Sequence, residues 1–402
     1  MTMKKVDTIF NRNFICIFFV QMLFSFAFNG VAAYVADYAY SLGAAAALAG
    51  FLSGMANGVA VLLKPVTVPA QVRVDKLKLL RFSYLLGAIA CAGYIFSPNV
   101  VLFTLFHFIS GAQVSITVSL TLTMASESVP SHKLVSGLAI FGLGGNIGNT
   151  FGPMLAERVM LAVSDVAGKS MGFKAVFLLG CLCNVIAIAL IFCIRLDKEE
   201  RISVSGPQDP WYKQIFEMRA LIPALMSMLV FAAHRLPNAF LLLYCEELGL
   251  PSGGSFFLVQ GAVLILTRLT LGKVLDKTNT TLMYILAATG FASGFLMIGF
   301  ARSMAALLCA SALLAFSIGI LQPLMQTLCI RSTTDNRRTI ACNTSSIGTD
   351  FGCFIGPTLL GGQVYALTGT YSSVFLLASV PVFLSMGLLF VFLIQQNKRG
   401  KA

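Results

Sequence analysis

The sequence predicts an all-α membrane protein with twelve transmembrane helices in two pseudo-symmetric six-helix halves. Three observations predict this class: an apolar composition, twelve long apolar runs, and motifs that recur at half the chain length. Hydrophobic residues make up 57% of the 402 residues and charged residues 11%, whereas soluble domains carry about 25% charged residues. A chain this apolar is expected to fold inside a lipid bilayer.

Each of the twelve apolar runs is long enough to cross a bilayer, which takes about 20 residues. In the first half we expect helices near residues 14–37, 44–67, 78–96, 100–125, 134–161 and 173–194. In the second half we expect them near residues 221–244, 253–275, 280–301, 304–330, 338–366 and 372–395. The first run is longer than a signal peptide and lacks a small-residue cleavage pattern, so we assign it as the first transmembrane helix.

A Gly-x-x-x-Gly-Pro pattern occurs twice, each time inside a long apolar segment. The first copy begins at Gly148 and the second at Gly352, which is 204 residues later (352 − 148). The basic residues Lys64 and Arg268 each follow an apolar run and are separated by the same 204 residues (268 − 64). Recurrence at half the chain length indicates a duplicated membrane protein.

The repeat divides the chain into an N-terminal half, residues 1–196, and a C-terminal half, residues 220–402, joined by a cytoplasmic linker, residues 197–219. The linker is the one sizeable polar stretch. Lys and Arg gather in the linker, at both chain ends and in alternate loops. By the positive-inside rule, both termini are expected in the cytoplasm, with the chain in the plasma membrane. The net charge of +12 is therefore assigned to membrane orientation and not to nucleic-acid binding.

The helix number, the two halves and the central linker resemble the major facilitator superfamily over essentially the whole chain. That family carries a Gly-rich signature with Asp and Arg in the loop between helices two and three. The second half holds a good copy, which runs from Arg268 through Gly272 to Asp276. The copy in the first half, at residues 64–71, lacks the expected Gly and Asp. In the family this loop helps to latch one conformation through charge pairs at helix ends.

Within that superfamily, the chain most resembles the twelve-helix drug:proton antiporter branch. The fifth helix resembles the Gly-rich signature of that branch in Asn146, Gly148, Gly152 and Pro153. In the fourth helix, His107 stands four residues before Gly111, where proton-coupled members carry Arg. The resemblance implies transport by alternating access, with the substrate near mid-membrane between the halves.

Ionisable residues inside the predicted spans are the sharpest candidates for proton coupling, because a charge in hydrocarbon costs several kcal/mol. Asp350 lies twelve residues beyond Arg338, or about 18 Å along a helix, and Arg235 lies about 21 Å along its own helix. We expect the two to pair or to share a water-filled cavity in which Asp350 titrates, unless they form a static ion pair that fixes packing. His107 and His234 are further candidates, although a membrane His is often a packing residue.

Uncharged polar residues inside the spans are candidates for lining a substrate cavity, since each needs a partner in lipid. They are Asn29, Gln113, Asn146, Asn149, Asn238, Gln260, Gln322 and Gln326. A lining of amides and aromatic rings suits an amphiphilic organic solute.

Small residues four apart let helices approach closely, and a following Pro permits a bend. The residues expected to serve gating and helix packing are Gly148, Gly152, Pro153, Gly352, Gly356, Pro357, Arg268, Gly272 and Asp276. Packing without functional bending is the alternative for the Gly-Pro copies.

The sequence lacks three kinds of functional motif. The chain has no phosphate-binding Gly-x-x-x-x-Gly-Lys-Ser/Thr loop, no spaced catalytic set and no His or Cys arrangement with metal-ligand spacing. We therefore expect no enzyme activity, no cofactor and no metal.

The expected function is secondary active transport, most simply the proton-coupled efflux of a small drug-like or amphiphilic compound. The alternatives are a proton-coupled importer of a small metabolite and a non-transporting membrane sensor. The expected partners are the lipid bilayer, a small-molecule substrate and protons, and we expect a monomer.

Overall fold

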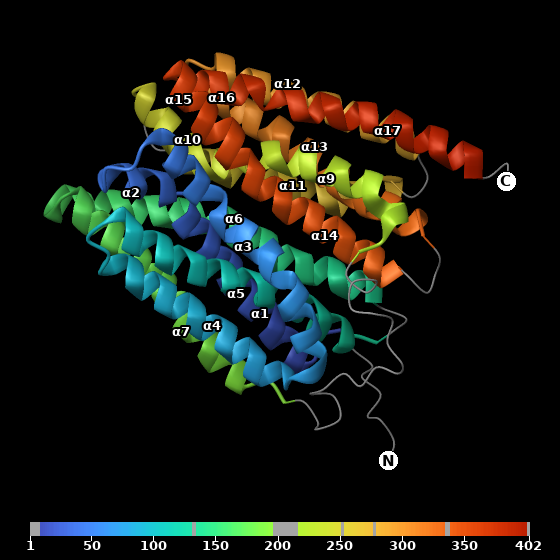
Figure 1. Ribbon diagram of the computed structural model, residues 1–402, viewed down its shortest axis with the longest axis horizontal. Coiled ribbons are helices and arrows are strands. Elements are labelled where there is room, and N and C mark those ends of the chain that lie inside the picture. Colours follow the sequence, from blue (N-terminus) through green and yellow to red (C-terminus); the bar gives the residue numbers. More distant parts are fainter. Residues whose placement is uncertain are drawn as a thin grey trace. The chain divides into compact units, whose positions relative to one another are not determined.

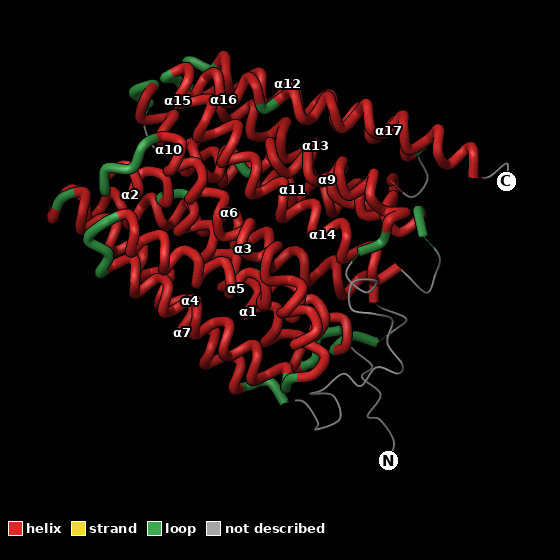
Figure 2. The backbone as a smooth tube through the Cα atoms, viewed as in Figure 1, coloured by secondary structure: helices red, strands yellow, loops and turns green. Residues whose placement is uncertain are grey.

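The computed structural model describes residues 9–130, 134–195, 216–250, 253–275, 279–333 and 338–399, and all regular structure within these ranges is helical (Figure 1, Figure 2). Among the described residues, nine helices or helix runs are long and apolar enough to cross a membrane, as judged by length and composition. These observations confirm the predicted all-α membrane class.

Seven helices make up the described chain up to residue 195. They are α1 (Arg12–Ala32), α2 (Val35–Ser41), α3 (Ala46–Arg73), α4 (Lys76–Ile95), α5 (Val100–Glu127), α6 (Leu134–Ala167) and α7 (Lys169–Phe192). Asparagine or aspartate side chains begin several of them by accepting hydrogen bonds from first-turn N–H groups, as Asn11 does in α1 and Asp75 in α4.

The remaining elements follow residue 216. They are η2 (Met218–Ala220), α9 (Leu221–His234), α10 (Leu236–Glu247), α11 (Gly254–Leu275), α12 (Thr280–Phe300), α13 (Met304–Arg331), α14 (Arg338–Ile355), the π-helical η4 (Gly356–Gln363), α15 (Val364–Thr368), α16 (Tyr371–Leu377) and α17 (Ser379–Arg399). Each of the twelve predicted ranges coincides with one helix or with helices in series.

The chain forms two compact units. Unit 1 contains residues 1–34 and 62–208, and unit 2 contains residues 35–61 and 209–402. In unit 1, α1 packs on α6 and α7, and α4 packs on α5 and α7. In unit 2, α9 packs on α14 and α17, while α13 packs on α11 and α12. The predicted linker lies mostly outside the described residues, and the division into halves at that linker stays a prediction.

The Gly-Pro segments make close contacts with the backbone of a neighbouring helix in each unit, and these contacts repeat. A Cβ added at Gly148 in α6 would overlap the carbonyl oxygen of Met22 in α1. A Cβ added at Gly352 in α14 would overlap the carbonyl oxygen of Met228 in α9. The glycines are 204 residues apart (352 − 148) and their partners are 206 apart (228 − 22). Unit 2 therefore repeats the α1–α6 packing of unit 1 in its own pair of helices α9 and α14. These two helices lie side by side in Figure 1.

The two Gly-Pro copies differ after the proline. Helix α6 continues as an α-helix past Pro153 to Ala167. After Gly356 and Pro357, by contrast, the chain is π-helical through Gln363. Proline has no N–H to continue the ladder of hydrogen bonds, and in this segment the helix widens to a π-helix where that donor is missing.

Candidate functional site

The first part of the candidate site is a break in the helix run α9–α10 of unit 2. Arg235 lies between the two helices, and its side chain is 9% exposed. The second residue of α10 is Pro237, which cannot donate a backbone hydrogen bond. The backbone stays hydrogen-bonded on both sides of the break, because the Arg235 N–H donates to the Phe231 carbonyl and the Arg235 carbonyl accepts from the Ala239 N–H.

Helix α14 brings Asp350 and Cys353 to the same place. These residues are three apart, so they share one face of the helix. The Cys353 thiol lies within electrostatic range of both the Arg235 guanidinium and the Asp350 carboxylate. The structure thus places the two predicted charges, which come from helices α9–α10 and α14, around one thiol.

His234 and Arg268 extend this group to two more helices. The His234 ring lies between Phe231 and Phe291, with ring centroids 5.5 and 6.1 Å away, and the side chain is within electrostatic range of both Arg235 and Arg268. On α11, Arg268 donates from Nη2 to Oε1 of Gln322 on α13 at 2.5 Å. We call these residues the unit 2 cluster: His234, Arg235, Arg268, Gln322, Asp350 and Cys353.

The other residues predicted for the C-terminal half are not members of the unit 2 cluster. Asn238 in α10 and Gln260 in α11 are half-buried, whereas the Gln326 side chain in α13 is exposed. Gly272 lies in α11. Asp276 lies outside the described residues.

In unit 1, two of the four predicted amides bind each other and Gln113 binds an amide that was not predicted, whereas the buried amide nitrogen of Asn146 has no hydrogen-bond partner among the described residues. Asn29 in α1 donates from Nδ2 to Oδ1 of Asn149 in α6 at 2.6 Å and to the carbonyl oxygen of Ser25 at 2.8 Å. Gln113 in α5 donates to Oδ1 of Asn184 in α7 at 2.6 Å. The sequence analysis missed Asn184, although an amide inside the apolar α7 was a visible signal. These pairs satisfy polar groups inside the unit and tie its helices together.

The fourth-helix candidate, His107, sits in an aromatic setting. Its Nδ1 lies 2.8 Å from the Tyr94 hydroxyl oxygen, and its ring stacks on Phe103 at 5.7 Å between centroids. The side chain is buried. These contacts join α4 to α5, so His107 has a packing role whatever its part in proton transfer.

The internal repeat relates the amides of unit 1 to members of the unit 2 cluster. With the spacing of 206 residues for α1 and α9, Arg235 corresponds to Asn29 (235 − 29). With the spacing of 204 residues for α6 and α14, Asp350 corresponds to Asn146 and Cys353 to Asn149. Unit 2 therefore carries a cation and an acid at positions where unit 1 carries neutral amides.

One close helix contact was not predicted from the sequence. On α3, Gly50, Gly54 and Gly58 follow one another at four-residue intervals and face the segment from Phe354 to Gly362. Beside them, the Asn57 side chain is 6% exposed, and its amide nitrogen has no hydrogen-bond partner among the described residues. The glycine spacing was visible in the sequence, but it has no copy 204 residues later, where Gly254, Leu258 and Ala262 stand.

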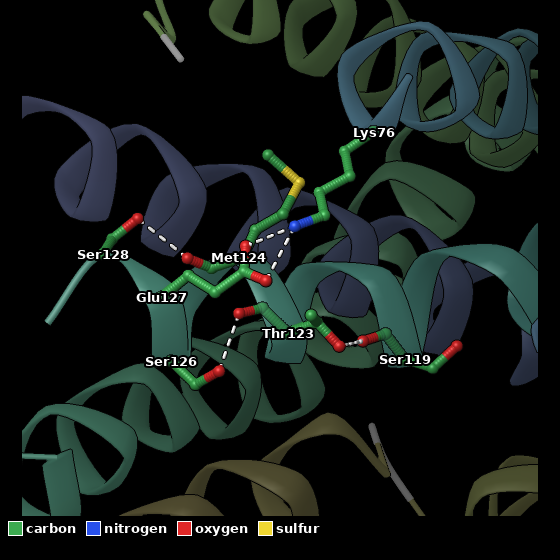
Figure 3. Close-up of polar contacts among 7 residues, drawn as sticks. All are labelled: Lys76, Ser119, Thr123, Met124, Ser126, Glu127 and Ser128. Carbon is green, nitrogen blue, oxygen red and sulfur yellow. Dashed lines mark hydrogen bonds and ion pairs between the residues drawn. The ribbon is translucent and has the colours of Figure 1, made fainter. Parts of the chain in front are cut away.

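A charge pair joins two helix ends in unit 1 (Figure 3). Lys76, the first residue of α4, donates from Nζ to both carboxylate oxygens of Glu127 at the end of α5, each at 2.7 Å. The Lys76 side chain is 3% exposed and that of Glu127 is 43% exposed. Lys76 follows residues 64–71, the degraded copy of the family signature, and its bond to Glu127 ties α4 to α5.

Replacing Lys76 with Gln is expected to lower the free energy of unfolding of the purified protein by about 1–2 kcal/mol. A bond to a charged group contributes about 1.5–3 kcal/mol, and the half-exposed Glu127 recovers part of that by hydration. Thermal unfolding in detergent measures the effect. Lys78→Gln is the matched control, because Lys78 is exposed on the same helix. Equal unfolding temperatures for the two variants would contradict a stabilising role of the pair.

Comparison with known proteins gives one family and a set of similar folds. Residues 17–357 match the sequence profile of the family described as the Major Facilitator Superfamily, which confirms the resemblance at the level of the superfamily. None of the curated proteins matches the chain in sequence. The narrower resemblance to drug:proton antiporters stays a prediction.

Solved structures with a similar fold include three transporters. The human organic anion transporter MFSD10 (TETRAN) is 16% identical, with 94% of this chain and 99% of that chain covered and a TM-score of 0.67. The nucleoside transporter NupG, in a mutant form, is 14% identical, with 94% and 99% covered and a TM-score of 0.74. A proton dependent oligopeptide transporter is 12% identical, with 96% and 99% covered and a TM-score of 0.75. At such identities the likeness shows the fold alone.

Proposed function

Because the chain belongs to the Major Facilitator Superfamily and is therefore a membrane transporter rather than an enzyme, we propose that it is a secondary active transporter that couples protons to the movement of a small organic compound. The compound crosses by alternating access, in which the site opens to one side of the membrane at a time. The leading form of the proposal is efflux of a drug-like or amphiphilic compound in exchange for protons.

The unit 2 cluster is the observation that carries proton coupling. A carboxylate inside a membrane protein is costly and usually faces a partner or a hydrated cavity. Asp350 and Arg235 both lie within electrostatic range of the Cys353 thiol. Protonation of the carboxylate therefore changes the net charge around a buried guanidinium. A transporter can use such a change to bias its two conformations, because each proton bound or released alters their relative free energies.

The proposal that the compound is exported rests on the Gly-Pro signature of α6. Gly148 and Gly152 pack on the backbone of α1, as expected of glycines that hold two helices close. Their pattern resembles that of the drug:proton antiporters. The proposal of efflux therefore comes from resemblance, while the proposal of proton coupling comes from the cluster.

Import together with a proton is a second candidate, and one observation favours it. The unit 2 cluster holds two guanidinium groups, Arg235 and Arg268, and one carboxylate, Asp350. A protonated Asp350 no longer balances the positive charge of the guanidinium groups, which could then bind an anionic substrate. The proton and the anion would therefore bind together. Ligands that favour each other's binding to one state tend to cross in the same direction. The proton dependent oligopeptide transporter with a similar fold shows that this fold accommodates proton-dependent transport.

Inside-out vesicles with an acidic lumen distinguish the two candidates. A panel of drugs and metabolites is added outside, and a pH-sensitive dye reports the lumen. An antiporter raises the lumen pH when its substrate is added, because protons leave as the compound enters. A symporter that carries the compound into the lumen lowers the lumen pH further, because protons enter with the compound. If no compound taken up in labelled form moves protons in either direction, the proposal of proton coupling fails.

The same vesicles test the proposed topology. We propose that both termini face the cytoplasm, that the chain sits in the plasma membrane, and that it works as a monomer of two halves, residues 1–196 and 220–402. The support is the concentration of Lys and Arg at the chain ends and in the linker. A protease-cleavable tag at either end should be cut in inside-out vesicles and protected in right-side-out ones. Cleavage in right-side-out vesicles would reverse the orientation.

A further inference from the structure

The interior of unit 2 carries more fixed positive than negative charge. Among its described residues, those of the Asp, Glu, His, Lys and Arg types that lie inside the spans and away from their ends are His234, Arg235, Arg268 and Asp350. Arginine stays protonated in proteins, so two positive charges face one carboxylate. Even if Asp350 neutralises one guanidinium, a second remains in a segment that crosses the membrane.

The second guanidinium is bound by a neutral group. Arg268 donates to the amide oxygen of Gln322, and an amide satisfies a hydrogen bond without balancing a charge. Within the described residues Arg268 is paired with this amide and with no acid, and a buried charge without a counter-charge is energetically costly. An anion that enters this region would offset that cost.

A further hydrogen-bond donor of unit 2 lies on α3, beside the segment that contacts α14. The Asn57 amide nitrogen is buried with no partner among the described residues. Asn57 precedes Gly58, which contacts the ring of Phe354, and Phe354 follows Cys353 of the unit 2 cluster. A donor-rich region of this kind matches a group that only accepts hydrogen bonds.

We propose that the interior of unit 2 binds an anionic group of the transported compound, either a carboxylate or another oxyanion such as a phosphate or sulfonate. This inference rests on the proposed transport function and names its substrate class. Arg235 and Arg268 are the charged contacts, since guanidinium groups match the geometry of oxyanions, and Asn57 donates an additional hydrogen bond. Unit 1 places the neutral Asn29 where unit 2 has Arg235, so the charge selectivity resides in unit 2.

A matched series of ligands on one ring system tests the charge preference. The full-length protein in detergent is titrated with 2-naphthoate, 2-naphthamide and 2-naphthylmethylammonium, and binding is measured at equilibrium. We expect 2-naphthoate to bind at least about tenfold more tightly than the other two, because one charge-assisted hydrogen bond contributes about 1.5–3 kcal/mol. Equal affinities, tighter binding of the amide or the ammonium compound, or no binding of 2-naphthoate would overturn the inference.

Variants of the arginines locate the site. Arg235→Gln and Arg268→Gln should each weaken 2-naphthoate binding at least about tenfold. Arg302→Gln removes an exposed charge between α12 and α13 and should leave it unchanged. Where a Gln variant unfolds, Arg235→Lys and Arg268→Lys keep the charge and should retain the preference for 2-naphthoate over 2-naphthamide with weaker affinity. Unchanged affinity in both folded Gln variants would place the anion elsewhere.

Transport measurements separate this inference from the function on which it rests. Arginine-dependent binding of 2-naphthoate without transport of any compound would support the anion site and remove the proposed function. Proton-coupled transport of a neutral or cationic compound by a protein that does not bind 2-naphthoate would do the opposite.

Discussion

Replacing Asp350 with Asn should abolish proton-driven accumulation of the substrate while exchange of labelled for unlabelled substrate continues. Asparagine has nearly the shape of aspartate, but it cannot bind or release a proton at neutral pH. One coupled proton and a gradient of 1 pH unit can sustain an accumulation of about tenfold, since each 1.4 kcal/mol changes a ratio tenfold. In the variant this ratio should fall to about one. Vesicles with labelled substrate and an imposed pH gradient measure it.

Two variants control this experiment. Asp165→Asn removes an exposed carboxylate from α6 and should leave accumulation unchanged, and Asp350→Glu keeps the acid and should retain part of the coupling. Full accumulation in folded Asp350→Asn would show that the carboxylate is a static counter-charge of the Arg235 region. In that case the variant should lose thermal stability instead, because a buried guanidinium would lose its acid.

Much of the fold followed from the sequence because the bilayer dictates helix length and because the chain is duplicated. The apolar runs predicted each helical range, although α3 and α6 each extend six residues beyond the predicted end (73 − 67 and 167 − 161). Helix breaks were harder to predict. Pro237 and Pro357 both lie inside spans, yet the first ends one α-helix and starts another, the second begins a π-helical segment, and Pro153 leaves α6 continuous. Each proline removes the same backbone donor, so the local sequence does not distinguish the three responses and tertiary packing decides among them.

The residues of the unit 2 cluster could be named in advance, but their grouping could not. Burial depth along a helix follows from counting residues, and it identified Arg235 and Asp350. The rotation of each helix about its axis decides which side chains meet, and no local pattern sets that rotation. The 206-residue spacing between α1 and α9, which would have aligned Arg235 with Asn29, emerges only from the contacts of Gly148 and Gly352. Asn57 was missed because its surroundings come from the distant α14 segment.

Replacing Gly148 or Gly352 with Ala should destabilise the protein by about 1–3 kcal/mol, the usual cost of forcing extra atoms into a packed core. An added Cβ would meet the backbone of Met22 in the first case and of Met228 in the second. Backbone cannot rotate away as a side chain can, so the helices must separate. Thermal unfolding of the purified variants in detergent measures the loss.

Gly145 provides a control on the same helix with the opposite expected sign. A Cβ there would meet only the Ser25 and Gln21 side chains, at 3.6 and 3.8 Å, which is ordinary contact. Alanine favours a helix over glycine by up to about 1 kcal/mol, so Gly145→Ala should be neutral or stabilising. Similar losses for Gly148→Ala and Gly352→Ala, with none for Gly145→Ala, would show that both copies of the motif serve close packing. If Gly148→Ala and Gly352→Ala unfold like the unaltered protein but transport poorly, the glycines are needed for movement between helices and not for holding them together.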